Sequence, residues 1–135
     1  MALDRGSGPR VVLVEDHELH ARLLRRALAA RLPGCVVEIY GSGSEAARRL
    51  SDPDDAAPDL LVLDLALPGA SGHALLSDRA RDARLAQIPA AIVTSSESAA
   101  DRQRSLELGA SLHVSKPLDA AGFAQLADRL AGLLG

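Results

Sequence analysis

The sequence predicts an α/β protein with a doubly wound, five-stranded parallel sheet and five helices. Two observations carry this prediction: short apolar runs recur along the chain, and segments with helical spacing of apolar residues alternate with them. A short apolar run is typical of a strand that is buried on both faces of a parallel sheet. Alternation with short connections implies right-handed crossovers, which place helices on both faces. With the strand order 2-1-3-4-5, the first and third strands are neighbours.

The five expected strands are apolar and have the length of a buried strand. They are VVLV (11–14), VVEI (36–39), LLVL (60–63), AAIV (90–93) and LHV (112–114). Each is followed by a segment that fits a helix.

The helices are predicted from apolar spacing and from capping residues. Apolar side chains recur at helical spacing in the first and last helices, at Leu19, Leu23, Leu24, Leu28 and Leu32, and at Phe123, Leu126, Leu130, Leu133 and Leu134. Gly43 and Ser44 are expected to precede a second helix over about 44–51, and Gly72 to start a third helix that runs to about 84. Ser96 is expected to cap a fourth helix that runs to Leu108, and Asp119 to cap the last helix. Gly109 fits the position after a helix end, where a left-handed backbone is common.

Length and composition fit one globular domain. The chain has 135 residues, 47% of them hydrophobic, and a net charge of -3, which argues against a disordered chain and against nucleic-acid binding. We expect residues 1–9 to be a flexible leader and 10–135 to be the domain. The single Cys35 excludes an internal disulfide, and no apolar stretch reaches the roughly 20 residues of a membrane span. These features predict a cytoplasmic protein with no membrane contact.

Polar residues stand at the carboxyl ends of four of the expected strands. Glu15 and Asp16 follow the first strand, Asp64 the third, Thr94 the fourth and Lys116 the fifth. In an open doubly wound sheet, ligands bind in the crevice at those ends, near the point where the strand order reverses. We therefore expect these side chains to converge on one site.

Three carboxylates in one crevice would repel one another unless a cation neutralised them. Oxygen ligands with a few retained waters suit Mg²⁺. Taken singly, Asp16 and Asp64 fit helix or turn caps, Thr94 fits an ordinary strand residue and Lys116 fits a surface cation. Their convergence favours a site, and Lys116 is the only lysine among the 15 basic residues.

Four motifs carry a resemblance to a known family. They are VVLVED (11–16), DLLVLDLALPGASG (59–72), AAIVTSSES (90–98) and GASLHVSKPLD (109–119). In this order and at this spacing, the sequence resembles the receiver domains of bacterial two-component response regulators, which have a flavodoxin-like fold. The expectation is a stand-alone, single-domain receiver without an output domain. The resemblance spans nearly the whole chain and implies a signalling phosphoacceptor rather than an enzyme that turns over substrates.

By this resemblance, Asp64 is the residue that accepts the phosphoryl group. Glu15 and Asp16 form the acidic pair that holds Mg²⁺ with Asp64, and the backbone carbonyl of Ala66 is a further ligand. Thr94 is expected to hydrogen-bond the phosphoryl group.

The resemblance also assigns roles to the two loops that flank the site. Lys116 is expected to pair with the phosphoryl group, and the peptide bond before Pro117 is usually cis in the family. Pro68, Gly69 and Gly72 are expected to shape the tight loop after the acceptor.

Signalling is expected to proceed from a sensor histidine kinase to an unknown downstream protein. The kinase candidates include a bacterial phytochrome and a hybrid kinase, and a homodimer is compatible with the sequence. Thr94 and residue 113 would form the switch, repacking the face of helix four, strand five and helix five. The family usually carries Tyr or Phe at position 113, whereas this chain has His113. A surface histidine without a signalling role is therefore the alternative.

Two other functions were weighed against the phosphoacceptor. A phosphatase of the haloacid dehalogenase type needs a second aspartate two residues after the first, and Ala66 stands there. A receiver-fold module that binds partners without phosphorylation remains the alternative. The small residues Ala66 and Ser96 suggest fast self-dephosphorylation, which a phosphoryl half-life of many hours would contradict. His17 and His20 are interpreted as residues of the helix surface.

Overall fold

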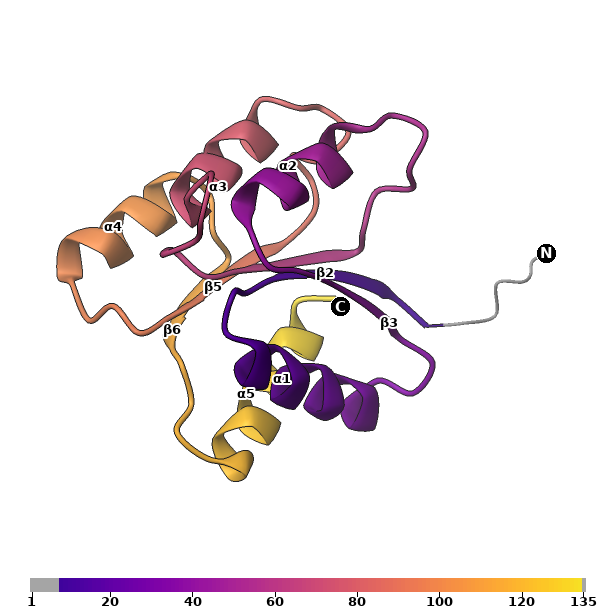
Figure 1. Cartoon of the computed structure of the whole chain (residues 1–135), viewed down its shortest axis with the longest axis vertical. Coiled ribbons are helices and arrows are strands. Elements are labelled where there is room, and N and C mark those ends of the chain that lie inside the picture. Colours follow the sequence, from indigo (N-terminus) through magenta and orange to yellow (C-terminus); the bar gives the residue numbers. More distant parts are fainter. Residues whose placement is uncertain (1–7, 135) are drawn as a thin grey trace.

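A five-stranded parallel sheet lies between two layers of helices in the computed structural model, which describes residues 8–134 (Figure 1). The strands are β2 (Arg10–Val14), β3 (Val36–Tyr40), β4 (Leu60–Leu63), β5 (Ala90–Thr94) and β6 (Leu112–Ser115). Their order in the sheet is β3-β2-β4-β5-β6. This confirms the predicted order 2-1-3-4-5 and all five expected strands.

Helices cover both faces of the sheet (Figure 1). The helices are α1 (Glu18–Arg31), α2 (Gly43–Ser51), α3 (Gly72–Ala80), α4 (Ala99–Glu107) and α5 (Ala120–Gly132). α1 and α5 pack together below the sheet, while α2, α3 and α4 lie above it. The doubly wound arrangement is therefore confirmed. Within residues 8–134, no helix has the length and apolar character needed to cross a membrane.

Two helix boundaries differ from the sequence-based expectation. The cap of α4 is Ser98, whose hydroxyl accepts from the amide of Asp101, because the Ser96 hydroxyl donates to the Asp101 carboxylate instead. α3 ends at Ala80 rather than near residue 84. Asp82 starts a turn there, and its carboxylate accepts a hydrogen bond from the amide of Arg84. Such a local bond competes with helical pairing. The expected caps at Asp119 and Gly109 are confirmed.

The strands differ in burial according to their place in the sheet. Every residue of β4 and β5 is buried, whereas all five residues of β3 are only half-buried and β6 contains one buried residue. The expectation of burial on both faces is therefore wrong for β3 and β6. Both are edge strands, with a neighbour on one side only.

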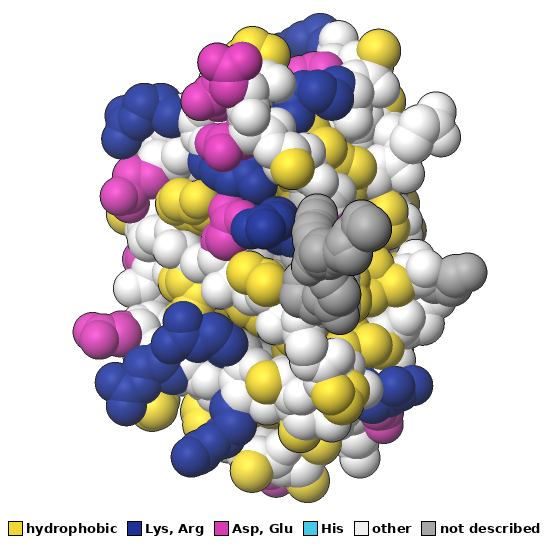
Figure 2. Space-filling view, turned by 90° about the vertical axis from the view of Figure 1, so that its right-hand side faces the viewer, with side chains coloured by type: hydrophobic (Ala, Val, Ile, Leu, Met, Phe, Trp, Pro, Cys, Tyr) yellow, Lys and Arg dark blue, Asp and Glu magenta, His cyan; other side chains and the backbone are white. Residues whose placement is uncertain are grey.

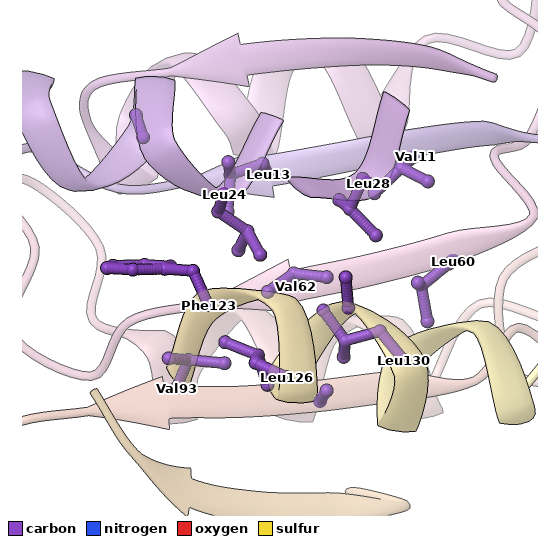
Figure 3. Packing of buried hydrophobic residues seen from close by; sticks show 13 residues of the cluster. Val11, Leu13, Leu24, Leu28, Leu60, Val62, Val93, Phe123, Leu126 and Leu130 are labelled. Carbon is purple, nitrogen blue, oxygen red and sulfur yellow. The ribbon is translucent and has the colours of Figure 1, made fainter. Parts of the chain in front are cut away.

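The core consists of two apolar layers, and the sheet lies between them. Val11 and Leu13 of β2 point to the layer of α1 and α5, while Val12 and Val14 point to the other layer, as the two-residue period of a strand requires. Figure 3 shows the first layer, in which side chains of α1 and of α5 meet over β4. Removing one of these leucines typically costs about 2–5 kcal/mol of stability.

The start of the described chain lies against the β3 edge. The amide of Gly8 donates to the carbonyl of Gly34, and the amide of Val36 donates to that of Pro9. Residues 1–7 of the expected leader lie outside the described residues. Figure 2 shows this side of the molecule, with Lys and Arg side chains over both its upper and its lower part.

Candidate functional site

Three carboxylates meet at the carboxyl ends of two neighbouring strands. Glu15 and Asp16 follow β2, and Asp64 follows β4. The two strands are paired in parallel, and the amide of Asp64 donates to the carbonyl of Val14. One oxygen from each of the three carboxylates lies within 4.8 Å of the others. The sequence-predicted acids therefore do converge, because parallel neighbours end at the same edge.

Lys116 reaches into this cluster from the end of β6. Its ammonium lies 2.9 Å from Asp64 Oδ2 and 2.9 Å from Glu15 Oε1, so it bridges the two acids. All three side chains are at least 88% buried. Burial lowers the pKa of Lys116, but hydrogen bonds to Asp64 and Glu15 raise it more, and the net pKa is above the ordinary value. Lys116 is therefore a permanent cation of the site.

The two buried carboxylates also accept backbone hydrogen bonds. Asp64 Oδ1 accepts from the amide of Leu65 at 2.7 Å, and Glu15 Oε2 accepts from the amide of His17 at 3.0 Å. These bonds fix the orientation of both side chains. Asp16 is exposed and completes the cluster from the solvent side.

The cluster fits a divalent cation by its chemistry. Three carboxylates face a single ammonium, so negative charge remains in excess. The donors that converge are carboxylate oxygens, which hard cations such as Mg²⁺ prefer. Glu15, Asp16 and Asp64 are therefore the residues that would hold the ion.

Thr94 ends β5 beside the cluster and is 2% exposed. Its hydroxyl oxygen accepts from the amide of Ser96 at 3.2 Å, which leaves the hydroxyl proton available to another acceptor. Its carbonyl accepts from the amide of Lys116 at 2.9 Å. This bond ties the end of β5 to the lysine that contacts Asp64.

The loop after Asp64 is shaped by two glycines. Gly69 has a φ of +82°, a left-handed conformation that side chains other than glycine rarely adopt. At Gly72, a Cβ atom would lie 2.2 Å from the carbonyl oxygen of Asp64. The carbonyl of Pro68 accepts from the amide of Gly43 and anchors the loop to α2. Ala66 lies exposed in this loop.

The peptide bond between Lys116 and Pro117 is trans, so the expected cis bond is wrong. Bonds before proline prefer trans by about 0.5–1 kcal/mol in the absence of other constraints. Lys116 nevertheless reaches the acids with the bond in this form.

His113 is buried in β6, at 6% exposure. Its Nδ1 lies 2.9 Å from the hydroxyl of Ser105 in α4, so the alternative of a surface histidine is wrong. His73 of α3 contacts the same hydroxyl at 2.9 Å. No sequence pattern pointed to His73 and Ser105, since no local pattern relates residues from three different elements.

His17 and His20 differ from one another. His17 is exposed and caps α1 by accepting from the amide of His20, which agrees with a helix-surface role. His20 is half-buried, stacks on His17 with ring centroids 3.9 Å apart and faces Phe123. Its burial, together with the nearby His17 and Lys116, lowers the pKa of His20. The surface interpretation is therefore wrong for His20.

A doubly wound sheet with paired acids, an aspartate and a lysine at its carboxyl edge defines a phosphoryl-accepting signalling domain. The family model of the response regulator receiver domain matches residues 11–128. The chain therefore belongs to the response regulator receiver family, whose members are the signalling phosphoacceptors of two-component systems.

Curated relatives match over the same region. The transcriptional regulatory protein TrcR of Mycobacterium tuberculosis is 35% identical over 129 residues, which is 96% of this chain. The phosphate regulon transcriptional regulatory protein PhoB of Rhizobium meliloti is 36% identical over 109 residues, or 81% of this chain. The match covers 46% of each of these relatives, so the chain spans about half their length.

Solved structures share the fold. The phosphorylated cyanobacterial phytochrome response regulator RcpA superposes with a TM-score of 0.85 at 26% identity, covering 95% of this chain and 94% of its own. The non-phosphorylated HemR receiver domain of Leptospira biflexa gives a TM-score of 0.78 at 31% identity, covering 94% of both chains.

Proposed function

We propose that the chain acts as a response regulator, in which Asp64 takes a phosphoryl group from a histidine kinase. The observation that carries this proposal is the contact of Lys116 with both Asp64 and Glu15 inside the acidic cluster. A buried aspartate that merely capped a turn would need neither a lysine nor two further acids around it. The proposal covers the receiver region and its contacts with partner proteins.

The reaction would begin with attack of an Asp64 carboxylate oxygen on the phosphorus atom of a phosphohistidine. The P–N bond breaks as the P–O bond forms, and the donor imidazole leaves. Asp64 is held for this attack by the amide of Leu65 and by Lys116. The fixed position supplies orientation, so little further ordering is needed at the moment of transfer.

Charge on the transferred oxygens is the main obstacle to this step. Lys116 is within reach of these oxygens, and its raised pKa keeps it protonated. Glu15, Asp16, Asp64 and the carbonyl of Ala66 would hold Mg²⁺. A bound magnesium ion supplies further positive charge beside the transferring oxygens. Thr94 would turn its free hydroxyl proton toward the new phosphoryl group.

The output of the switch would be a change at the face of α4, β6 and α5. Thr94 and His113 lie on neighbouring strands near this face. Phosphorylation adds close to two negative charges beside Thr94, which favours one of two arrangements of the face. A downstream protein, or a second copy of the chain, would recognise that arrangement. The likeness to RcpA, a cyanobacterial phytochrome response regulator, supports a bacterial phytochrome as the donor, and a hybrid kinase is the other candidate.

Intact mass spectrometry tests the proposal. The protein is incubated with Mg²⁺ and a small phosphodonor, with rapid quenching in acid to trap short-lived species. We expect a single phosphoryl addition that depends on Mg²⁺ and is absent from Asp64→Asn. Absence of any adduct in the wild type would instead favour a receiver-fold module that binds partners without phosphorylation.

A further inference from the structure

Two histidines from different elements share one buried hydroxyl. His73 Nε2 of α3 and His113 Nδ1 of β6 each lie 2.9 Å from Ser105 Oγ of α4. Ser105 is fully buried. Its hydroxyl group is also 3.0 Å from the carbonyl oxygen of Asp101, one turn earlier in α4. The cluster therefore joins three elements through a single oxygen atom.

The proton count of this cluster fixes the form of both rings. A serine hydroxyl has one proton, and here it is donated to the Asp101 carbonyl. The oxygen then only accepts from the histidines, so both ring nitrogens that face it must carry a proton. A neutral His113 is protonated at Nδ1 and a neutral His73 at Nε2. The network is complete with two neutral rings and needs no further proton.

The surroundings oppose a charge on His113. Burial lowers the pKa of His113, and the nearby Arg102 and His73 lower it further, while Asp101 acts in the opposite direction. The Arg102 guanidinium donates to the backbone carbonyl of His113 at 3.0 Å. The Asp101 carboxylate is held by the Ser96 hydroxyl at 2.6 Å.

Few other charged groups face His113 from the elements around it. Glu97, from the loop before α4, lines the same surface cavity as His113 and Arg102. From β5, the residue in register with His113 is the apolar Ile92. Among the described residues, the balance around His113 is therefore set by burial, Arg102 and His73 on one side and by Asp101 on the other.

We propose that His73, Ser105 and His113 form a proton-operated clasp, which holds α3, α4 and β6 together while His113 is neutral and opens when His113 is protonated. A second proton on His113 would place a charge inside a buried site in which, within residues 8–134, no carboxylate forms a hydrogen bond or ion pair with the ring. His113 would then turn toward solvent, and α4 would lose one of its ties to β6. The clasp acts in the unphosphorylated chain, so its failure would leave the phosphoacceptor proposal intact.

The direction of the pH effect follows from linkage. The folded-state pKa of His113 lies below the ordinary value of 6.5, so the unfolded chain takes up the proton first as the pH falls. The stabilisation is therefore complete above about pH 6.5 and is lost as the pH falls through the folded-state pKa. Acid opens the clasp and neutral pH closes it.

Nuclear magnetic resonance of the full, unphosphorylated chain tests the clasp directly. Long-range proton–nitrogen spectra are recorded from about pH 8 to about pH 5, the range in which histidine titrates. We expect His113 as the Nδ1–H form and His73 as the Nε2–H form at high pH. His113 should titrate below 6.5, and the backbone amides of α4 should shift with the same midpoint. An Nε2–H form of His113, or α4 amides that do not follow its titration, would overturn the proposal.

Glutamine variants separate the clasp from a merely structural contact. His73→Gln keeps an N–H donor for Ser105 but does not titrate, so the pKa of His113 should rise toward 6.5. His113→Gln should abolish the pH-dependent shift of the α4 amides. His17→Gln, on the opposite face of the sheet, is the matched control and should leave the shift unchanged. An unchanged pKa of His113 in His73→Gln would contradict the clasp, and so would loss of the α4 shift in His17→Gln.

Discussion

The ammonium of Lys116 lies 2.9 Å from Asp64 Oδ2 and 2.9 Å from Glu15 Oε1, although these residues come from three separate strand ends. The contact places the one lysine of the chain where two carboxylates need a compact positive charge. Arginine has a planar fork and a different reach, so it does not replace an ammonium held between two acids.

Lys116→Met should destabilise the protein at neutral pH, because the buried acids lose their cation. Removal of one partner from a buried ion pair typically costs about 3–5 kcal/mol. The loss should shrink on acidification, since protonation of a carboxylate relieves the repulsion. Urea unfolding at several pH values measures both effects. A variant as stable as the wild type at neutral pH would show that Lys116 does not neutralise the cluster.

Mg²⁺ should stabilise the folded protein, because it binds an acidic cluster that exists only in the folded chain. At a Mg²⁺ concentration of 100 times the dissociation constant, the expected gain is about 2.7 kcal/mol. Thermal unfolding with and without Mg²⁺ measures it. The Asp16→Asn variant should lose most of the stabilisation by Mg²⁺. Glu18→Gln is the control, since Glu18 is exposed and stands outside the cluster; equal stabilisation of both variants would rule out this site.

Gly72→Ala should destabilise the loop that carries the site. A Cβ atom there would lie 2.2 Å from the carbonyl of Asp64, and such overpacking typically costs about 1–3 kcal/mol or more. Gly132→Ala is the matched control, because a Cβ at Gly132 meets no atom within 4 Å. In that variant stability should stay the same or rise by up to about 1 kcal/mol. Equal unfolding midpoints for the two variants would show that the loop accommodates the added Cβ atom at little cost.

A hydrogen-bonded network around Glu38 of β3 should make the stability of the folded protein depend on pH. Burial raises the pKa of Glu38, but hydrogen bonds from Arg49, Arg10 and Tyr40 lower it more, to about 2. The contribution of Glu38 is therefore present above its unfolded value of 4.5 and is lost as the pH falls toward 2.

Glu38→Gln tests this network. At neutral pH the variant should be less stable by roughly 1.5–3 kcal/mol, the usual worth of hydrogen bonds to a charged group. The difference from the wild type should narrow as the pH falls below about 4.5. Urea unfolding curves at neutral and acid pH provide the measurement. A constant difference at all pH values would mean that charge is not what Glu38 contributes.

The sheet and the acids at its edge were predictable from the sequence, because both follow from local patterns. Apolar runs located the strands, and their alternation with helical segments indicated a parallel, doubly wound sheet. With the order 2-1-3-4-5, Glu15 and Asp64 follow neighbouring strands, whereas the side chain of Lys116 reaches them from the end of β6, with β5 between β6 and β4. Side-chain partners across elements were not predictable: the contact of His113 with Ser105 depends on how α4 lies against β6.

Competing local hydrogen bonds account for other differences. Ser96 and Ser98 are equally good caps by sequence, and only the bond of Ser96 to Asp101 decides that Ser98 caps α4. The half-burial of β3 follows from its place at the sheet edge. An apolar run cannot report that place, since edge and central strands have similar residues here.

Chemical trapping shows directly whether Asp64 is the residue that accepts the phosphoryl group. Borohydride reduces an acyl phosphate to an alcohol with release of phosphate, so a phosphorylated aspartate becomes homoserine. After treatment with Mg²⁺ and a phosphodonor, peptide mass spectrometry should find homoserine at position 64 in the wild type and in the control Asp59→Asn. Homoserine at Asp16 or at any other aspartate, with position 64 unchanged, would contradict this role of Asp64.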